Sequence, residues 1–180
     1  MVGPGRQERA WIRGAQSGSV SDLEALFREH WPRAHRSAFL VVQDAAAAED
    51  IAQEAFLAAV RNLDRFDRRR PFGPWLHRIV VNRAIDWARA RALRREMAPI
   101  ETGDEAEFDT GDLANPFSEG IAAGLASLRP EQRAVIVLRY LLEYSPGEIA
   151  DLLDLPRGTV NSRLRRGLDR LEHILDRGPR

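Results

Sequence analysis

Apolar residues recur at three- and four-residue intervals through most of this sequence, which is the spacing of amphipathic helices. No stretch of useful length alternates as a β-strand does, and no internal repeat occurs. In the first half the pattern predicts helices over about residues 7–16, 21–42, 44–62 and 75–95. Ser21 or Asp22 is expected to cap the second of these, and Pro32 inside it predicts a kink or a break.

Periodicity is absent from Met97 to about Asn115, where Gly, Asp, Glu and Thr dominate, so this segment is predicted to be a linker. Beyond it the pattern predicts helices over about residues 117–126 and 130–142, and then a helical hairpin over 145–175. We therefore expect an all-α protein of two small helical domains joined by a flexible acidic linker. The expected boundaries are 1–96 for the first domain, 97–116 for the linker and 117–180 for the second domain.

The hairpin has strong local signals at its first helix and its turn. Ser145 is a good N-cap, Pro146 suits the first helical position, and Glu148 stands where a capping box needs a carboxylate. Pro156 cannot continue this helix, so the turn is placed at residues 154–156. Asp154 must supply the left-handed conformation there, which Asp tolerates better than most residues.

The second helix of the hairpin carries an apolar stripe and a polar side. The stripe consists of Val160, Leu164, Leu168, Leu171 and Leu175, and the polar side contains Asn161, Ser162, Arg163, Arg165 and Arg166. An ordinary hairpin with a solvated arginine face is the simpler interpretation. The small Ala150 at the helix crossing, a turn of fixed length and Val160 ten residues later favour a helix-turn-helix, whose second helix enters the DNA major groove.

Charge is unevenly distributed although the net charge is +0. Residues 1–96 carry a net +5, residues 97–128 a net −7 and residues 129–180 a net +2. All 27 basic residues are arginine, which suits contacts with phosphate and guanine. Two basic domains on either side of an acidic segment are compatible with nucleic-acid binding.

Several classes of function find no support in the residues. Without cysteine there can be no disulfide or thiolate metal site, and the four histidines are scattered. No phosphate-binding loop, nucleophile elbow or paired-carboxylate constellation occurs, so we expect no enzyme activity, cofactor or metal. No apolar run reaches the length of a membrane span and the beginning of the sequence lacks a signal-peptide core, so we expect a cytoplasmic protein without membrane insertion.

Three segments together resemble the extracytoplasmic-function (ECF, group IV) RNA polymerase sigma factors. They are AEDIAQEAFLAAVRNLDRF (Ala48–Phe66), FGPWLHRIVVNRAIDWARARALRR (Phe72–Arg95) and LRPEQRAVIVLRYLLEYSPGEIADLLDLPRGTVNSRLRR (Leu128–Arg166). The resemblance covers about residues 7–175. It implies that the first domain is sigma region 2 and the second is sigma region 4, and that the protein directs core RNA polymerase to promoters.

The resemblance also implies roles for residues of the first domain. The face that docks onto the β′ clamp of polymerase contains Asp50, Gln53, Glu54 and Phe56. The residues that recognise and help to melt the −10 element are Asp67, Arg68, Arg69, Arg70, Phe72, Arg78, Asn82, Arg83 and Asp86. The loop departs from the usual small, glycine-containing sequence, so the preferred base is open. Trp75 either stacks on a flipped base or, as its helical register favours, packs in the core.

In the second domain the resemblance implies −35 recognition by Thr159, Asn161, Ser162, Arg163, Arg165 and Arg166. Arginine pairs with guanine and asparagine with adenine, whereas Arg163 is expected to clamp a phosphate. The helix over 128–142 would present the hairpin to the β flap of polymerase. The acidic linker either imitates nucleic acid inside polymerase or is a solvated tether.

The partners implied are core RNA polymerase, promoter DNA and an anti-sigma factor. A self-contained helix-turn-helix regulator that dimerises on a palindrome is the alternative, but it would not need the face at residues 50–54 or the loop before Trp75. A helical adaptor that binds acidic proteins is a third possibility. It would not need the turn chemistry of residues 154–159.

Overall fold

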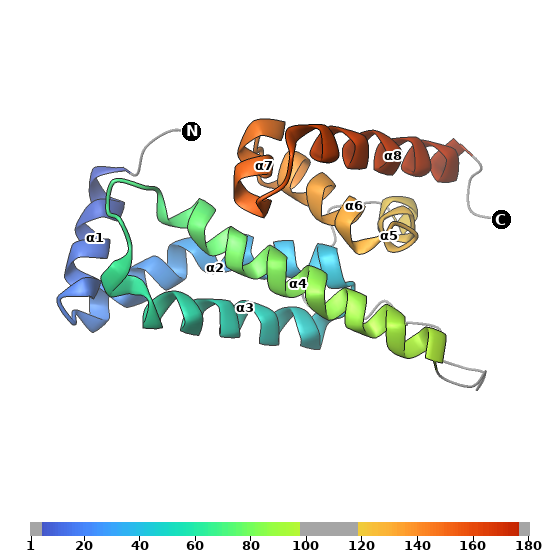
Figure 1. The fold of residues 1–180 in the computed structure, drawn as a ribbon. Helices are drawn as coiled ribbons and strands as arrows, with labels where there is room; N and C mark the ends of the chain where they lie inside the picture. Colours follow the sequence, from blue (N-terminus) through green and yellow to red (C-terminus); the bar gives the residue numbers. More distant parts are fainter. Residues whose placement is uncertain (1–4, 98–118, 177–180) are drawn as a thin grey trace.

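The computed structural model describes residues 5–97 and 119–176, and these residues form helices and short connections without a strand. The first group is α1 (Arg6–Gln16), α2 (Val20–Val42), α3 (Ala45–Arg61), the 3₁₀ turn η1 (Leu63–Arg65) and α4 (Phe72–Met97). The second group is α5 (Glu119–Ala126), α6 (Pro130–Ile136), the π-helical turn η2 (Val137–Leu141), α7 (Pro146–Leu153) and α8 (Arg157–Asp176). We call the two groups the first lobe and the second lobe (Figure 1).

The helices of the first lobe begin close to the predicted positions, with two corrections. Ser19, rather than Ser21 or Asp22, caps α2, because its hydroxyl accepts a hydrogen bond from the Asp22 amide at 3.3 Å. Pro32 lies inside α2 without ending it. Asp44, where the third helix was predicted to start, is the N-cap of α3, since its carboxylate accepts the Ala47 amide at 3.0 Å.

Helix α4 begins three residues before the predicted start at Trp75. The reason lies in the aromatic core at this end of the lobe. Phe72 is 3% exposed and its ring lies 5.8 Å from that of Phe66 and 5.6 Å from that of Trp75. Burial of Phe72 therefore draws the end of the preceding loop into the first turn of α4.

Small residues let the helices of the first lobe approach one another. The buried face of α3 consists largely of alanine, and it packs against α2 and α4. The residues of this core with no exposed surface include Leu26, Val41, Leu76, Val80 and Val81. Figure 1 shows α2, α3 and α4 running side by side, with α1 across one end.

The second lobe contains the predicted helix-turn-helix, in α7 and α8. The Ser145 hydroxyl accepts the Glu148 amide, and the Glu148 carboxylate accepts the Ser145 amide at 2.9 Å, which completes the capping box. Asp154 has φ 54° and ψ 51°, so it adopts the predicted left-handed turn. Gly167 allows α8 to lie close to α6, because a Cβ at this position would stand 2.7 Å from the Ile136 side chain.

One helix of the second lobe differs from expectation. The single helix predicted over 130–142 is α6 followed by the wider turn η2, which ends at Leu141. The backbone then reverses through Glu143, which has φ 60°, and this places the buried Tyr144 just before α7.

The two lobes pack against each other. Helix α6 contacts α2 and α4, η2 contacts α2, and α7 contacts α4 (Figure 1). Met97 closes α4, and the remainder of the predicted linker lies outside the described residues. Within the described ranges, no helix is long and apolar enough to cross a membrane.

Candidate nucleic-acid interface

The predicted docking face is an exposed polar surface of α3. Asp50, Gln53 and Glu54 are all exposed, and the Gln53 amide donates to the Glu49 carboxylate at 3.1 Å. Arg83 of α4 donates a hydrogen bond to the carboxylate of Glu54. This side of the first lobe therefore presents carboxylates and an amide next to Arg83.

Phe56 does not belong to that exposed surface. It is 6% exposed, and its ring lies 4.8 Å from Phe27 and 5.8 Å from Trp31 of α2. Only its edge reaches the surface, at the floor of an apolar groove of about 400 Å³ between α2 and α3. Phe56 therefore supports the face instead of forming it.

The apolar groove itself was not predicted. Four of its residues are large hydrophobic side chains with high exposure: Val20 at 77%, Phe27 at 39%, Leu57 at 54% and Val60 at 40%. Gln53 lies at its edge, so the groove continues the polar face. The sequence contained one signal for this groove. Leu57 and Val60 follow Gln53 by one and two helical turns, so they lie on its side of α3 and outside the buried alanine face.

The arginine-rich loop before α4 has a defined turn. The Asp67 carboxylate accepts the Arg69 amide at 2.9 Å, and the Asp67 carbonyl accepts the Arg70 amide at 2.9 Å. Arg68, Arg69 and Arg70 are exposed. The turn therefore holds three guanidinium groups in water at one end of α4.

A depression of about 450 Å³ lies between this loop and the surface of α4. Trp75 forms part of its wall and is half-buried, with its ring 4.7 Å from that of Phe66. The other lining residues are Asn62, Arg65, Asp67, Arg70 and Ile79. An aromatic wall with arginines at the rim has the composition that binds an unstacked base.

The remaining residues of the first predicted DNA-binding set lie on α4. Arg78 and Asp86 are exposed, while Asn82 and Arg83 are half-buried. Phe72 is buried in the aromatic core described above and is not accessible to DNA. It can act only by holding the loop in place.

The second predicted DNA-binding set follows the outer side of α8. Asn161, Arg165 and Arg166 are exposed. Thr159, Ser162 and Arg163 are half-buried, and the Ser162 hydroxyl donates to the Thr159 carbonyl at 3.0 Å. Val160 and Leu164 are buried on the opposite side, as predicted, but Leu168 and Leu175 of the same predicted stripe are 38% and 47% exposed.

Arg163 lies in the field of a carboxylate. Burial raises the pKa of Glu131, but the hydrogen bond from Arg89 and the positive charges of Arg89 and Arg163 outweigh it. The pKa of Glu131 is therefore lowered, and this carboxylate is negative at neutral pH. Arg163 is half-buried near this carboxylate, whereas Arg165 and Arg166 are exposed.

The described residues contain no group of three or more His, Asp or Glu side chains that could hold a metal ion. Among the histidines, His77 is buried and His173 is exposed. The Nδ1 atom of His77 lies 2.8 Å from the hydroxyl of Tyr144, in the other lobe.

Both lobes match models of known protein families. Residues 26–94 match Sigma-70 region 2, and residues 118–171 match Sigma-70, region 4. The docking face, the arginine-rich loop and α4 fall within the first match, and the helix-turn-helix falls within the second.

Individual relatives match along nearly the whole chain. The ECF RNA polymerase sigma factor SigW of Bacillus subtilis is 30% identical, over 91% of this chain and 92% of its own length. The ECF RNA polymerase sigma factor SigM of Mycobacterium tuberculosis is 34% identical, over 95% of this chain and 87% of its own.

Solved structures share the fold. CnrH, solved in complex with the cytosolic domain of CnrY, has a TM-score of 0.71 and 29% identity, covering 96% of this chain and 99% of that one. The sigma factor RpoE of Bartonella quintana, solved with the anti-sigma factor NepR, has a TM-score of 0.67 and 23% identity, covering 89% and 100%. With two family models in order and relatives matched from end to end, the chain belongs to the ECF RNA polymerase sigma factors.

Proposed function

We propose that the exposed surfaces described above carry out the separate tasks of a sigma factor. As an ECF sigma factor, the protein binds core RNA polymerase, recognises the −10 and −35 promoter elements and promotes transcription initiation. The observation that carries the assignment of surfaces is their distribution: a carboxylate face and an arginine-rich loop on one lobe, and a helix-turn-helix with free arginines on the other.

Polymerase docking is assigned to Asp50, Gln53 and Glu54, together with the apolar groove beside them. The polar groups provide charge complementarity for a basic partner, which favours specificity and a fast association rate. The groove supplies the apolar area that a polar rim alone lacks. A clamp surface of polymerase with arginines around an apolar ridge fits both features.

Recognition of the −10 element is assigned to the loop of Arg68, Arg69 and Arg70 and to the exposed side of α4. Melting requires a base to leave the stack, and the depression beside Trp75 has room and an aromatic wall to hold it. The arginines track the phosphates of the single strand. Both interpretations of Trp75 therefore apply, because the ring packs on Phe66 and also borders the depression.

Recognition of the −35 element is assigned to α8. Asn161, Arg165 and Arg166 are exposed and reach base edges, whereas Arg163 and Thr159 are better placed for the backbone of DNA. We assign residues 1–96 to region 2 and 117–180 to region 4, with the acidic linker between them.

We also propose a protein partner and a cellular location. CnrH, at 29% identity, forms a complex with the cytosolic domain of a second protein, and this supports restraint of the present chain by an anti-sigma factor. We infer that the protein acts in the cytoplasm beside polymerase, and that it supplies no catalytic chemistry of its own. A self-contained regulator is not favoured, because matched regions 2 and 4 account for both lobes.

Run-off transcription with purified bacterial core polymerase tests this function. A library of promoters with varied −10 and −35 elements is transcribed with and without the protein. We expect transcripts only when the protein is present, with base preferences at both elements. Absence of a complex with core polymerase, or of any transcript, contradicts the proposal.

A further inference from the structure

One side chain of α1 holds the segment from which the arginine-rich loop departs. Gln16, the last residue of α1, donates two hydrogen bonds from its half-buried side-chain amide. Its Nε2 atom lies 2.8 Å from the Leu63 carbonyl oxygen and 3.1 Å from the Phe66 carbonyl oxygen. These acceptors are 47 and 50 positions away in the sequence, so the contact ties α1 to a distant part of the first lobe.

Both carbonyls lie at the entry to the loop. The Leu63 carbonyl also accepts the Phe66 amide at 2.9 Å, which closes η1. The Phe66 carbonyl belongs to the peptide group that leads into Asp67, whose carboxylate and carbonyl accept the two amides of the arginine turn. Because a peptide group is planar, holding the Phe66 carbonyl also fixes the direction in which the chain enters that turn.

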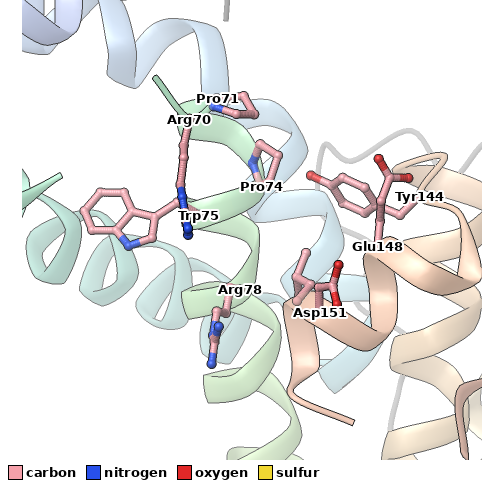
Figure 2. Close-up of a pocket in the computed structure, with 9 residues that line it drawn as sticks. Arg70, Pro71, Pro74, Trp75, Arg78, Tyr144, Glu148 and Asp151 are labelled. Carbon is pink, nitrogen blue, oxygen red and sulfur yellow. The ribbon is translucent and has the colours of Figure 1, made fainter. Parts of the chain in front are cut away.

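The same segment forms a wall of the depression beside Trp75. The lining residues that it contributes are Asn62, Arg65, Phe66 and Asp67. Figure 2 shows the side chain of Arg70 running along the start of α4 beside Trp75, and both of these residues also line the depression. Gln16 is not a lining residue, so it can act on the depression only through the main chain that it holds.

The far end of the loop is supported from the same side. The ring of His30 lies 5.1 Å from that of Phe72, and a Cβ at Gly73 would stand 3.4 Å from the His30 ring. The carboxylate of Glu8, in α1, lies 3.1 Å from Nε2 of His30. Helix α1 is therefore connected to the loop at its entry directly and at its exit through α2. The match to Sigma-70 region 2 begins at residue 26, so it does not include α1.

We propose that Gln16 is a positioning residue for recognition of the −10 element: by holding the Leu63 and Phe66 carbonyls, it keeps the arginine turn and the wall of the depression in the arrangement that selects a base. A site discriminates between bases only while its supporting groups keep it in one geometry. The effect on promoters rests on the proposed function, whereas the hold on the loop can be measured in the free protein.

The first measurement uses the full chain without polymerase. Gln16→Met keeps the length of the side chain and removes its donors, and Gln7→Met is the matched control, because Gln7 is an exposed residue of the same helix. Amide hydrogen exchange, followed by NMR, reports local opening of the loop. The amides of Phe66 and Arg70 should exchange about 2- to 10-fold faster in Gln16→Met, the effect of one lost hydrogen bond, and at the natural rate in Gln7→Met.

The second measurement is run-off transcription from pairs of promoters that differ at one base of either the −10 or the −35 element. With the sigma factor limiting, the ratio of transcripts within a pair is independent of the amount of folded protein, so a merely structural role would not change it. Gln16→Met should lower the ratio at one −10 position by about 2- to 10-fold and leave the −35 ratios unchanged. Gln7→Met should leave all ratios unchanged.

Two further variants complete the test. Gln16→Lys supplies an ammonium that can donate to both carbonyls, and it should restore the −10 ratio. If Gln16→Met loses helical content by circular dichroism, Gln16→Asn replaces it, since its amide is one methylene shorter and cannot reach both carbonyls. Equal exchange rates in Gln16→Met and Gln7→Met, an unchanged −10 ratio, or an equal fall of the −10 and −35 ratios overturns the proposal. An inactive natural chain instead contradicts the proposed function, and the exchange rates then decide whether Gln16 holds the loop.

Discussion

The guanidinium of Arg83 donates a hydrogen bond to the carboxylate of Glu54, and this ion pair joins the two assigned surfaces of the first lobe. We assign Glu54 to the proposed docking face of α3, and Arg83 to the proposed −10 surface of α4. The two helices pack against each other along a buried core, so the surfaces keep a fixed relative position. We therefore expect that docking on polymerase through this face also orients the groups assigned to the −10 element.

Replacing Glu54 by Gln removes the charge of one partner while keeping its shape. The side chains of Arg83 and Glu54 are 41% and 62% exposed, so the free energy of unfolding should change by less than about 1 kcal/mol. Affinity for core polymerase should fall, because a docking carboxylate is lost. Urea denaturation and fluorescence titration measure the two quantities. A large loss of stability with unchanged affinity would give Glu54 a structural role instead.

Charge reversal at Asp50 should weaken docking more strongly. Asp50→Arg places a cation against a basic partner, and we expect at least a tenfold loss of affinity for core polymerase, or about 1.4 kcal/mol. Glu29→Arg is the matched control, because Glu29 is an exposed acid of α2 outside the assigned face. Equal losses for the two variants would indicate a general charge effect.

The arginines of α8 should separate into base readers and phosphate contacts. Arg165→Ala should relax preference at one upstream base pair, at a cost of about 1–3 kcal/mol for the preferred base. Arg163→Ala should weaken all promoters alike and lower the salt dependence of binding by about one ion. Promoter-library transcription at two salt concentrations distinguishes these effects. A uniform loss for Arg165→Ala would make it a phosphate contact.

The left-handed turn at Asp154 should respond to backbone preference. Asp154→Gly removes the side chain that this conformation strains, so stability should be kept or increased. Asp154→Ala should lose about 1 kcal/mol, because alanine tolerates the left-handed conformation less well than glycine or Asp does. Thermal unfolding of the two variants gives the comparison. Equal stability of both variants would show that the turn is not strained.

Because His77 is buried, we expect the free energy of unfolding to depend on pH. Burial, and to a lesser extent the positive charges of His30 and Arg33 of α2, lower the pKa of His77 from 6.5 to about 3. Tyr144 faces the ring from the other lobe. The unfolded chain therefore binds a proton at pH values where the folded chain does not, so stability is full above about pH 6.5 and is lost as pH falls towards 3.

The size of this effect follows from linkage. Stability should fall by about 1.4 kcal/mol for each pH unit below about 6.5, in addition to the contribution of other groups. His77→Gln lacks the titrating group and should lose this part of the slope, whereas His173→Gln, at an exposed position, should retain it. Urea denaturation between about pH 7 and pH 5 measures the slopes, which must differ between the two variants.

Local chemistry explains which parts of the fold could be predicted from the sequence. The hairpin was predicted correctly because its capping box and left-handed turn depend on residues within ten positions of one another. The start of α4 was wrong by three residues, because Phe72 is held by aromatic partners outside its own helix. Apolar periodicity cannot report such contacts.

In the candidate site, too, some residues could be placed from the sequence and others could not. The polar members of the predicted sets are exposed or half-buried, whereas Phe56 and Phe72 are buried in the core. The apolar groove and the contacts between the two lobes could not be predicted, because they bring together residues distant in sequence. His77 and Tyr144, for example, are 67 positions apart, and neither stands out in its own segment. Their functional roles stay predictions until the variants above are measured.

Arg133 of α6 donates a hydrogen bond to the Val41 carbonyl of α2 at 2.6 Å, and this contact has a consequence for protein engineering. Burial lowers the pKa of Arg133 to about 10, so the guanidinium remains a cation at neutral pH at the end of α2. Its acceptor there is a main-chain oxygen, which every amino acid supplies. Chimeras that combine the second lobe of this protein with the first lobe of a homologue can therefore keep this contact whatever side chain stands at position 41, provided that the helix ends at the same place.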